Sequence, residues 1–414
     1  CVSIFGSQNR VMDMRQGMLL LHRWVGLVIT VFLVVVGLTG SLLAFYSELD
    51  RLLSPRLYPE SRPTIARLGI AQLADKAAEL APQAQVIAVT LREVERAEVR
   101  VAPRSEADAD TLEFDTLLLD PQTGEELGRR KWGDLSQGRI NLMPFIYRLH
   151  NELALGSFGL WLLGIIALMW TLDCFAGLYL TLPACRRELG GSFWQRWQVA
   201  WRIKWRGGPY RVVYDLHRAS SLWLWLVLIV FAWSSVYMNL WDTVYTWTTR
   251  AVLDYQPSWT VVAEPTPPST HGRLSWREAE KILLRQTDAQ SRLHNVQVLS
   301  PVALRYSPES GTYTYQFRTN RDVQDRLGMT ELIIDAHSGE LLAFLLPSGQ
   351  YSGNTVSSWL SALHKANVFG LTYRIFVCML GLAITMLSVT GVIIWWKKRK
   401  AQLQSRMRRK NGVH

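Results

Sequence analysis

The chain has 414 residues, of which 49% are hydrophobic, and a formal net charge of +11 at pH 7. Its mean hydropathy of only +0.06 means that the apolar residues must be concentrated in particular segments. Because the basic residues cluster beside those segments, the positive charge indicates contact with membrane lipid and excludes nucleic acid as the partner.

Four long apolar stretches predict membrane-spanning helices. Apart from Asp173, charged side chains are absent from residues 24–47, 153–185, 219–241 and 375–396. Each stretch exceeds the ~20 residues that a helix needs to cross a bilayer. The sequence therefore predicts an α-helical membrane protein with transmembrane helices at 18–47, 146–183, 214–246 and 359–396.

The distribution of Lys and Arg predicts the orientation of these helices. Segment 183–218 holds eight basic and two acidic residues, and the tail from Lys397 holds eight basic residues and no acidic one. Since basic residues near the ends of spans stay in the cytoplasm, both termini are expected there. The predicted cytoplasmic parts are the N-terminal segment 1–17, the loop 184–213 and the tail 397–414.

The two polar segments between spans, 48–145 and 247–358, should face the opposite side. Each contains a helical stretch followed by a run of β-forming residues, a tight turn with Gly, and another run. Each is therefore expected to be a small α+β domain, and the chain to consist of two parallel repeats. The matching pieces are the helices Ile65–Leu80 and Trp276–Arg285, and the hairpins Leu117–Glu125 and Leu332–Glu340.

Four of the eight histidines share one sequence context. Each directly follows a Leu, and each lies near the start of an apolar stretch. Imidazole is a good ligand for iron, and an ionisable side chain at membrane depth indicates a functional site. We therefore predict that these histidines are axial ligands of haem. The four pairs are Leu21-His22, Leu149-His150, Leu216-His217 and Leu363-His364.

The predicted topology divides these histidines into two pairs. His22 and His217 belong to the cytoplasmic face, and His150 and His364 to the outer face, roughly 30 Å away. That separation excludes a single four-histidine zinc site, whose nitrogens would lie about 2 Å from the metal. Two imidazoles at each face can hold one six-coordinate haem, which suits electron transfer. For any one histidine, the alternative is a polar end-cap among lipid headgroups.

Cations beside the histidines are candidate partners of haem propionates. They are Arg23, Arg218, Arg148 and Lys365, and ordinary boundary charges are an equal alternative. Tryptophans within the spans can pack on porphyrin faces, although core or lipid-facing packing is the simpler interpretation. These are Trp161, Trp170, Trp225 and Trp233.

Asp173 is the one acid deep in a span, so it should face the bundle interior. It can relay protons, accept a hydrogen bond from a ligating imidazole, or be a structural acid with a partner. The remaining histidines of the second polar segment are expected to be scattered surface residues. They are His271, His294 and His337.

At these motifs the chain resembles the PepSY-associated transmembrane family, from Met14 to Lys400. The features that match are the Leu-His helix starts, the four spans and the paired turns of Leu-Leu-Asp-x-x-x-Gly-Glu type. Within the family it is most similar to FoxB-like inner-membrane proteins of Gram-negative bacteria. The resemblance implies PepSY-like periplasmic domains, two haem b groups, and reduction of a ferric siderophore of the ferrioxamine type.

We therefore expect a haem-dependent ferric-siderophore reductase of the bacterial inner membrane. No Gly-rich dinucleotide fingerprint follows a predicted strand, so the electron donor should be a cytoplasmic component or quinol. No hydrolase arrangement is present either, and no catalytic residue beyond the haems is expected. Two alternatives stay open: a haem-independent siderophore permease, and a PepSY-based sensor or assembly protein.

Overall fold

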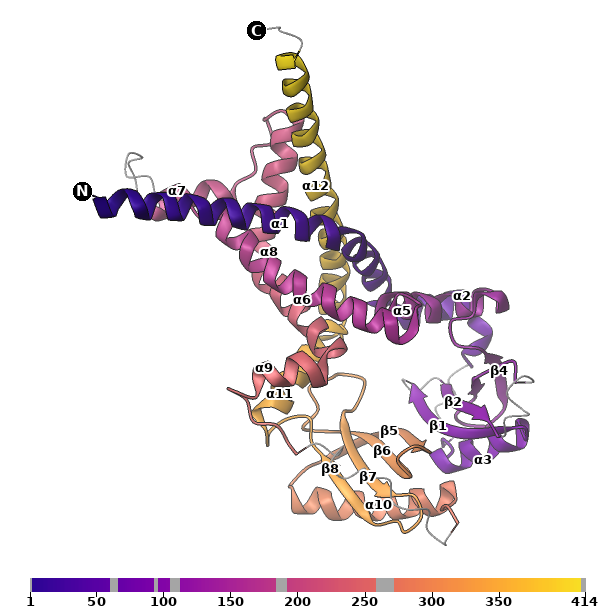
Figure 1. Cartoon of the computed structure of the whole chain (residues 1–414). Helices are drawn as coiled ribbons and strands as arrows, with labels where there is room; N and C mark the ends of the chain where they lie inside the picture. The colour runs from indigo at the N-terminus through magenta and orange to yellow at the C-terminus, as the bar shows by residue number, and fades with distance from the viewer. Residues whose placement is uncertain are drawn as a thin grey trace. The chain divides into compact units, whose positions relative to one another are not determined.

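The computed structural model describes residues 2–59, 66–92, 96–104, 112–183, 192–257 and 272–410 (Figure 1). The predicted linker Glu264–Ser269 and His271 lie outside these ranges. The chain divides into two compact units. The first comprises Cys1–Leu42, Leu149–Tyr245 and Ile375–His414, and the second comprises Leu43–Arg148 and Thr246–Arg374.

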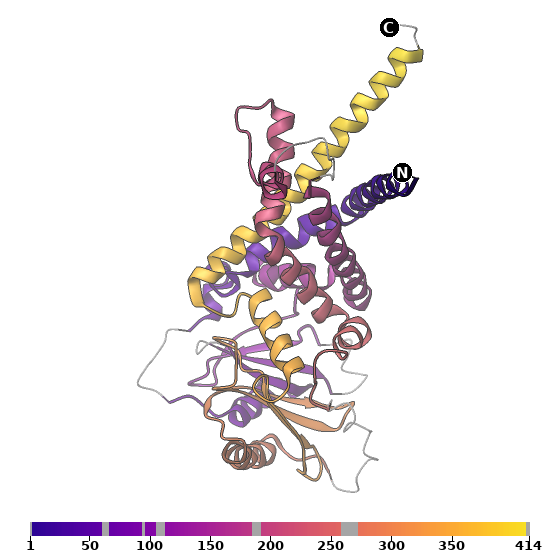
Figure 2. The ribbon, with the colours of Figure 1, turned by 90° about the vertical axis from the view of Figure 1, so that its left-hand side faces the viewer.

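Four helices of the described chain are long and apolar enough to cross a membrane, which confirms the prediction of a multi-pass membrane protein. The fourth continues without a break from its apolar part into the basic C-terminal segment (Figure 2). The four are α1 (Val2–Leu43), α6 (Gly156–Thr181), α8 (Pro209–Asn239) and α12 (Gly370–Lys410).

Small residues allow α1 and α12 to pack closely. Gly37 and Ser41 on α1 face Gly381 on α12, and a Cβ added to Gly381 would overlap the Gly37 carbonyl oxygen. The Ser41 hydroxyl also donates to the Cys378 carbonyl oxygen at 2.8 Å. Small residues four apart are the usual means of bringing membrane helices together, because no hydrophobic force drives their association in lipid.

Hydrogen bonds attach α6 to both α1 and α8. The Arg15 guanidinium of α1 donates to the carbonyl oxygens of Leu180 and Leu182, at 2.8 and 3.1 Å. These carbonyls end α6 and have no partner within the helix. The Trp225 indole of α8 donates to the Cys174 carbonyl oxygen at 3.0 Å. The spans of the first unit are therefore held by specific polar contacts as well as by packing.

The predicted spans 146–183 and 359–396 were wrong in one respect, because a short helix precedes each membrane helix. α5 (Leu142–Glu152) comes before α6, and α11 (Ser352–His364) comes before α12. Residues with left-handed backbone conformation interrupt the chain between them, and this conformation ends a right-handed helix. They are Leu153, Ala154 and Gly156 in the first break, and Ala366, Phe369 and Gly370 in the second.

The second unit contains one eight-stranded antiparallel sheet, where the sequence predicted two separate ones. The central strands β1 (Ala84–Arg92) and β5 (Val298–Ser307) pair at Ala88–Arg305, Val89–Leu304 and Thr90–Ala303. The sheet order is β4-β3-β2-β1-β5-β6-β7-β8. The other strands are β2 (Arg96–Pro103), β3 (Thr116–Leu119), β4 (Glu126–Arg130), β6 (Thr312–Thr319), β7 (Thr330–Asp335) and β8 (Leu341–Leu345).

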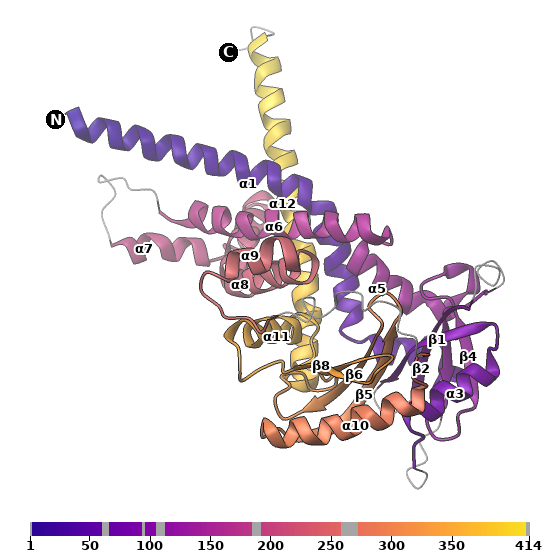
Figure 3. The same ribbon diagram turned by 60° about the horizontal axis from the view of Figure 1, so that its bottom comes forward.

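Both helices of the second unit's core, α3 (Ile70–Leu80) and α10 (Trp276–Leu293), cover the same face of this sheet (Figure 3). Apolar side chains in register across the strands form the layer beneath them. One row of cross-strand neighbours joins both halves into a continuous core. It consists of Leu117, Val99, Val89, Leu304, Tyr315, Leu332 and Phe344.

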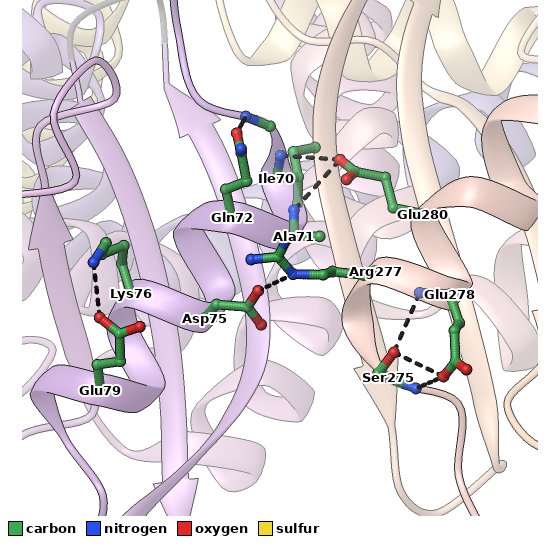
Figure 4. A network of polar contacts seen from close by, with 11 residues as sticks. Ile70, Ala71, Gln72, Asp75, Lys76, Glu79, Ser275, Arg277, Glu278 and Glu280 are labelled. Carbon is green, nitrogen blue, oxygen red and sulfur yellow. Dashed lines mark hydrogen bonds and ion pairs between the residues drawn. The ribbon is translucent and has the colours of Figure 1, made fainter.

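The helices α3 and α10 also bond to each other (Figure 4). Arg277 pairs with Asp75 at 2.5 Å. Glu280 of α10 accepts hydrogen bonds from the backbone N–H groups of Ile70 and Ala71, at 3.0 and 3.4 Å. Because Gly69 precedes α3 and has no side chain, Glu280 provides the N-terminal cap that the sequence of α3 lacks.

The two predicted hairpins are confirmed. Asp120 and Asp335 each accept backbone N–H groups two and three residues further on. Gly124 and Gly339 follow with φ of 74° and 75°, a conformation that favours glycine. The turns join β3 to β4 and β7 to β8.

A buried charge cluster attaches the helix α2 (Tyr46–Leu53) to the sheet. Asp50 is fully buried and pairs with Arg96 at 2.9 Å and Arg130 at 3.5 Å. It also accepts the Tyr58 hydroxyl at 2.8 Å, and burial raises the pKa of that phenol. A second carboxylate, that of Glu98, lies 2.8 Å from Arg96, so the cluster contains two acids and two arginines. The four charged side chains therefore balance, although all of them are removed from water.

The remaining helical segments are short. They are η1 (Pro55–Leu57), η2 (Leu135–Gln137), η3 (Arg139–Asn141), α7 (Phe193–Trp197), η4 (Gln198–Trp201), the π-helical η5 (Trp241–Tyr245) and α9 (Thr246–Thr249).

Replacing Asp50 by Ala should destabilise the second unit by about 3–5 kcal/mol, because Arg130 would lose its buried counter-ion and Arg96 would keep only Glu98. Thermal unfolding of the full-length protein, followed by circular dichroism, measures the fall in Tm. The control is Asp75→Ala, whose ion pair with Arg277 is exposed and should contribute less than about 1 kcal/mol. Equal Tm values for the two variants would contradict this account.

Gly381→Ala should separate α1 from α12, since the added methyl group meets the carbonyl oxygen of Gly37 and the hydroxyl of Ser41. Overpacking of this kind costs about 1–3 kcal/mol. Gly26→Ala in α1 is the matched control, because no heavy atom lies within 4 Å of its added Cβ. Thermal stability in detergent should fall for Gly381→Ala alone, and a loss of the same size in both variants would refute the proposed contact.

Candidate functional site

Two of the four predicted histidine ligands lie side by side in the first unit. His22 on α1 and His217 on α8 have ring centroids 6.3 Å apart, with their planes inclined by 55°. Nearly two hundred residues separate them in the sequence, and packing of the spans brings them together.

The His22 imidazole is held by the acid that the sequence singled out. Its Nδ1 lies 2.9 Å from a carboxylate oxygen of Asp173 on α6. The Asp173 side chain is 9% exposed and the His22 side chain 31%. Since the carboxylate accepts and Nδ1 donates, Nε2 is the ring nitrogen that can bind a metal. Of the roles considered for Asp173, this geometry favours orientation of the imidazole.

His217 is held by uncharged oxygens. Its Nδ1 lies 3.0 Å from the Leu387 carbonyl oxygen and 3.0 Å from the Thr390 hydroxyl, both on α12. A carbonyl oxygen can only accept, so Nδ1 carries the proton. The two histidines therefore present the same ring nitrogen, Nε2, for binding.

Glycines lie opposite the imidazoles. A Cβ added to Gly177 of α6 would lie 3.5 Å from Cε1 of His22, and one on Gly391 of α12 would lie 3.4 Å from Cε1 of His217. Both glycines stand 27 residues after a histidine of a Leu-His pair, His150 and His364 respectively. The equal spacing was visible in the sequence, but only the helix packing shows which histidine each glycine faces.

The third histidine, His150, lies on α5 and also contacts α1. Its Nδ1 is 3.0 Å from the Thr39 hydroxyl, and a Cβ on Gly40 would lie 3.0 Å from its Cε1. Thr39 and Gly40 were not predicted from the sequence. They are ordinary small residues of an apolar helix, and no local pattern distinguishes them.

The fourth histidine, His364, is the last residue of α11 and belongs to the second unit. Its pairing with His150 therefore stays a prediction. Lys365, the neighbouring cation, is exposed.

The profile of the PepSY-associated TM region matches residues 19–398. The chain belongs to this family. The match spans nearly all of the described chain and confirms the resemblance seen in the Leu-His motifs and paired turns. No curated protein matches the sequence.

In this PepSY-associated TM protein, the predicted propionate partners have different surroundings. Arg218 donates to the buried Asp215 and to the Val199 carbonyl oxygen, each at 2.8 Å, so it already has structural partners. Arg148 packs over Gly133, and Arg23 is half-buried. Asp215 also forms an ion pair with Arg211 at 2.8 Å. The cluster therefore stabilises the start of α8.

The tryptophans of the spans fit ordinary packing better than contact with a cofactor. Trp225 bonds to α6, and Trp233 packs against Tyr245 with centroids 5.7 Å apart. Trp161 is 53% exposed on the bundle surface, which suits contact with lipid. Trp170 is partly buried.

Among the described residues, no group of three or more His, Cys, Asp or Glu side chains has metal-site geometry. In the second unit, His294 bonds to Gln350 at 3.1 Å and packs on Phe344. His337 lies within the second hairpin turn, where its backbone N–H donates to Asp335. Neither histidine belongs to the unit that contains the membrane helices, so His22 and His217 are the best-defined pair of candidate ligands in the described chain.

Proposed function

We propose that this protein is a di-haem reductase of the bacterial inner membrane that reduces a ferric siderophore in the periplasm. The observation that carries the proposal is the distance between His22 and His217. With metal–nitrogen bonds of about 2 Å, two imidazoles on opposite sides of one metal ion have ring centres roughly 6 Å apart. The centroids here are 6.3 Å apart.

The surroundings of the two rings support the same assignment. Nδ1 of each ring is bonded to protein, which fixes the ring orientation and leaves Nε2 for the iron. Gly177 and Gly391 keep the space beside the imidazoles free of side chains. When bound, a haem with two imidazole ligands supplies one-electron transfer and offers no open position to oxygen.

We assign His150 and His364 to a second haem at the outer face. Both stand on short helices, α5 and α11, that precede a span and are followed by a left-handed break. The duplicated order of helix and sheet in the two halves supports this correspondence. With the basic segments in the cytoplasm, His22 and His217 serve the side where electrons enter from a cytoplasmic donor or quinol.

The resemblance implies the substrate class, and the chemistry of iron release is compatible with it. Hard oxygen ligands hold ferric iron strongly and ferrous iron less well. Transfer of one electron to the chelated iron therefore loosens it without breaking a bond of the siderophore. The resemblance to FoxB-like proteins supports a substrate of the ferrioxamine type, and it supports this reductase over the permease and sensor alternatives.

Single His→Ala variants test the ligand assignment. His22→Ala and His217→Ala should each remove the same half of the haem absorbance, and His150→Ala and His364→Ala the other half. The control His294→Ala should retain both, since that residue lies outside the bundle. Pyridine haemochrome assays and reduced-minus-oxidised spectra of detergent-purified protein measure this. Folded wild-type protein without haem would refute the proposal.

Reductase activity is tested by adding ferrioxamine to the pre-reduced protein without oxygen. The haem bands should reoxidise, with one ferrous ion released for each electron lost. The gallium complex of the same siderophore is the matched control, because its metal has the same charge and cannot be reduced under these conditions. Reoxidation by both complexes, or by neither, would contradict a ferric-siderophore reductase.

A further inference from the structure

The partners of the two cytoplasmic-side imidazoles differ in charge. His22 donates to the carboxylate of Asp173, whereas His217 donates to the neutral oxygens of Leu387 and Thr390. Asp173 and Leu387 occupy equivalent places, because each lies 23 residues after the histidine of a Leu-His pair. Of these two corresponding positions, only that of Asp173 carries a charged side chain.

Asp173 is a costly residue to bury. Its side chain is 9% exposed within an apolar helix, and no Lys or Arg pairs with it in the described part of the chain. The ion pairs of Asp215, the other acid within a span, show the usual solution, with Arg211 and Arg218 as partners. A buried acid whose partner is a histidine indicates that the negative charge acts on that histidine.

A carboxylate bonded to Nδ1 makes the imidazole a more basic ligand and places negative charge near the metal. The oxidised site carries one more positive charge than the reduced site, so the carboxylate stabilises the oxidised form. Burial strengthens this effect because the local dielectric is low. Hydrogen bonding around the axial ligands is one of the means by which proteins set haem potentials.

We infer that Asp173 is a positioning residue that lowers the reduction potential of the His22/His217 site. This inference rests on the proposed function. His150, by contrast, has a hydroxyl, that of Thr39, at Nδ1. The carboxylate at the cytoplasmic side therefore creates a potential difference that favours electron flow outward, toward the siderophore.

The first test is Asp173→Asn, which keeps the shape of the side chain and an oxygen that can accept from Nδ1 but removes the charge. In a spectroelectrochemical titration, the His22/His217 component should shift to higher potential. At a fixed applied potential its reduced-to-oxidised ratio should rise about tenfold, equal to ~59 mV for one electron. The other component should not move.

Thr39→Val is the matched control, since it removes one neutral partner of His150. Its effect should be smaller and confined to the other component. A purely structural role for Asp173 predicts a change in haem content or Tm without a change in potential. Haem-loaded Asp173→Asn protein with wild-type potentials would therefore overturn the inference.

A second variant tests the same effect without altering Asp173. Thr390→Asp adds a carboxylate beside Nδ1 of His217, and should lower the potential of the same component further. Thr390→Val is its neutral control. If Asp173→Asn cannot hold haem, this variant decides the matter, and an unchanged potential would refute the inference. Absence of haem from the wild-type protein would instead refute the proposed function.

Discussion

The arrangement of the bundle depends on one constraint: an imidazole among apolar helices needs a protein partner for one ring nitrogen. His22, His217 and His150 all meet it through Nδ1, with partners on a neighbouring helix. Each such bond fixes the ring plane and links two helices. The contacts that orient the histidines therefore also hold α1 to α6 and α8 to α12, so the site and the membrane fold are stabilised by the same interactions.

In the second unit, the main constraint is the pairing of the sheet's edge strands. Two four-stranded meanders would each leave an edge strand with unpaired backbone groups next to the other. Pairing of β1 with β5 removes those two edges and gives one sheet with a shared core. The helices reinforce the junction, because Glu280 caps α3 from the other half of the sheet. The neutral cluster around Asp50 then fixes α2 to this sheet.

Corresponding positions in the two halves of the sequence can be alike or can differ. Gly124 and Gly339 both follow hairpin turns with nearly the same backbone conformation. At the position of Asp173 and Leu387 the halves differ by a full charge, next to imidazoles that lie 6.3 Å apart. A single acid therefore makes the surroundings of the two neighbouring imidazoles unequal.

The sequence by itself determined the existence of four spans, the two hairpin turns, the candidate histidines and the family, because these follow from local periodicity, composition and short motifs. Only the tertiary structure decided which residues meet. Breaks at Leu153 and Ala366 were invisible because Leu and Ala favour helices. Packing between distant segments produces the pairing of β1 with β5. It also produces the contact of Thr39 with His150 and the hydrogen bond between His22 and Asp173. Such packing leaves no local signal in the chain.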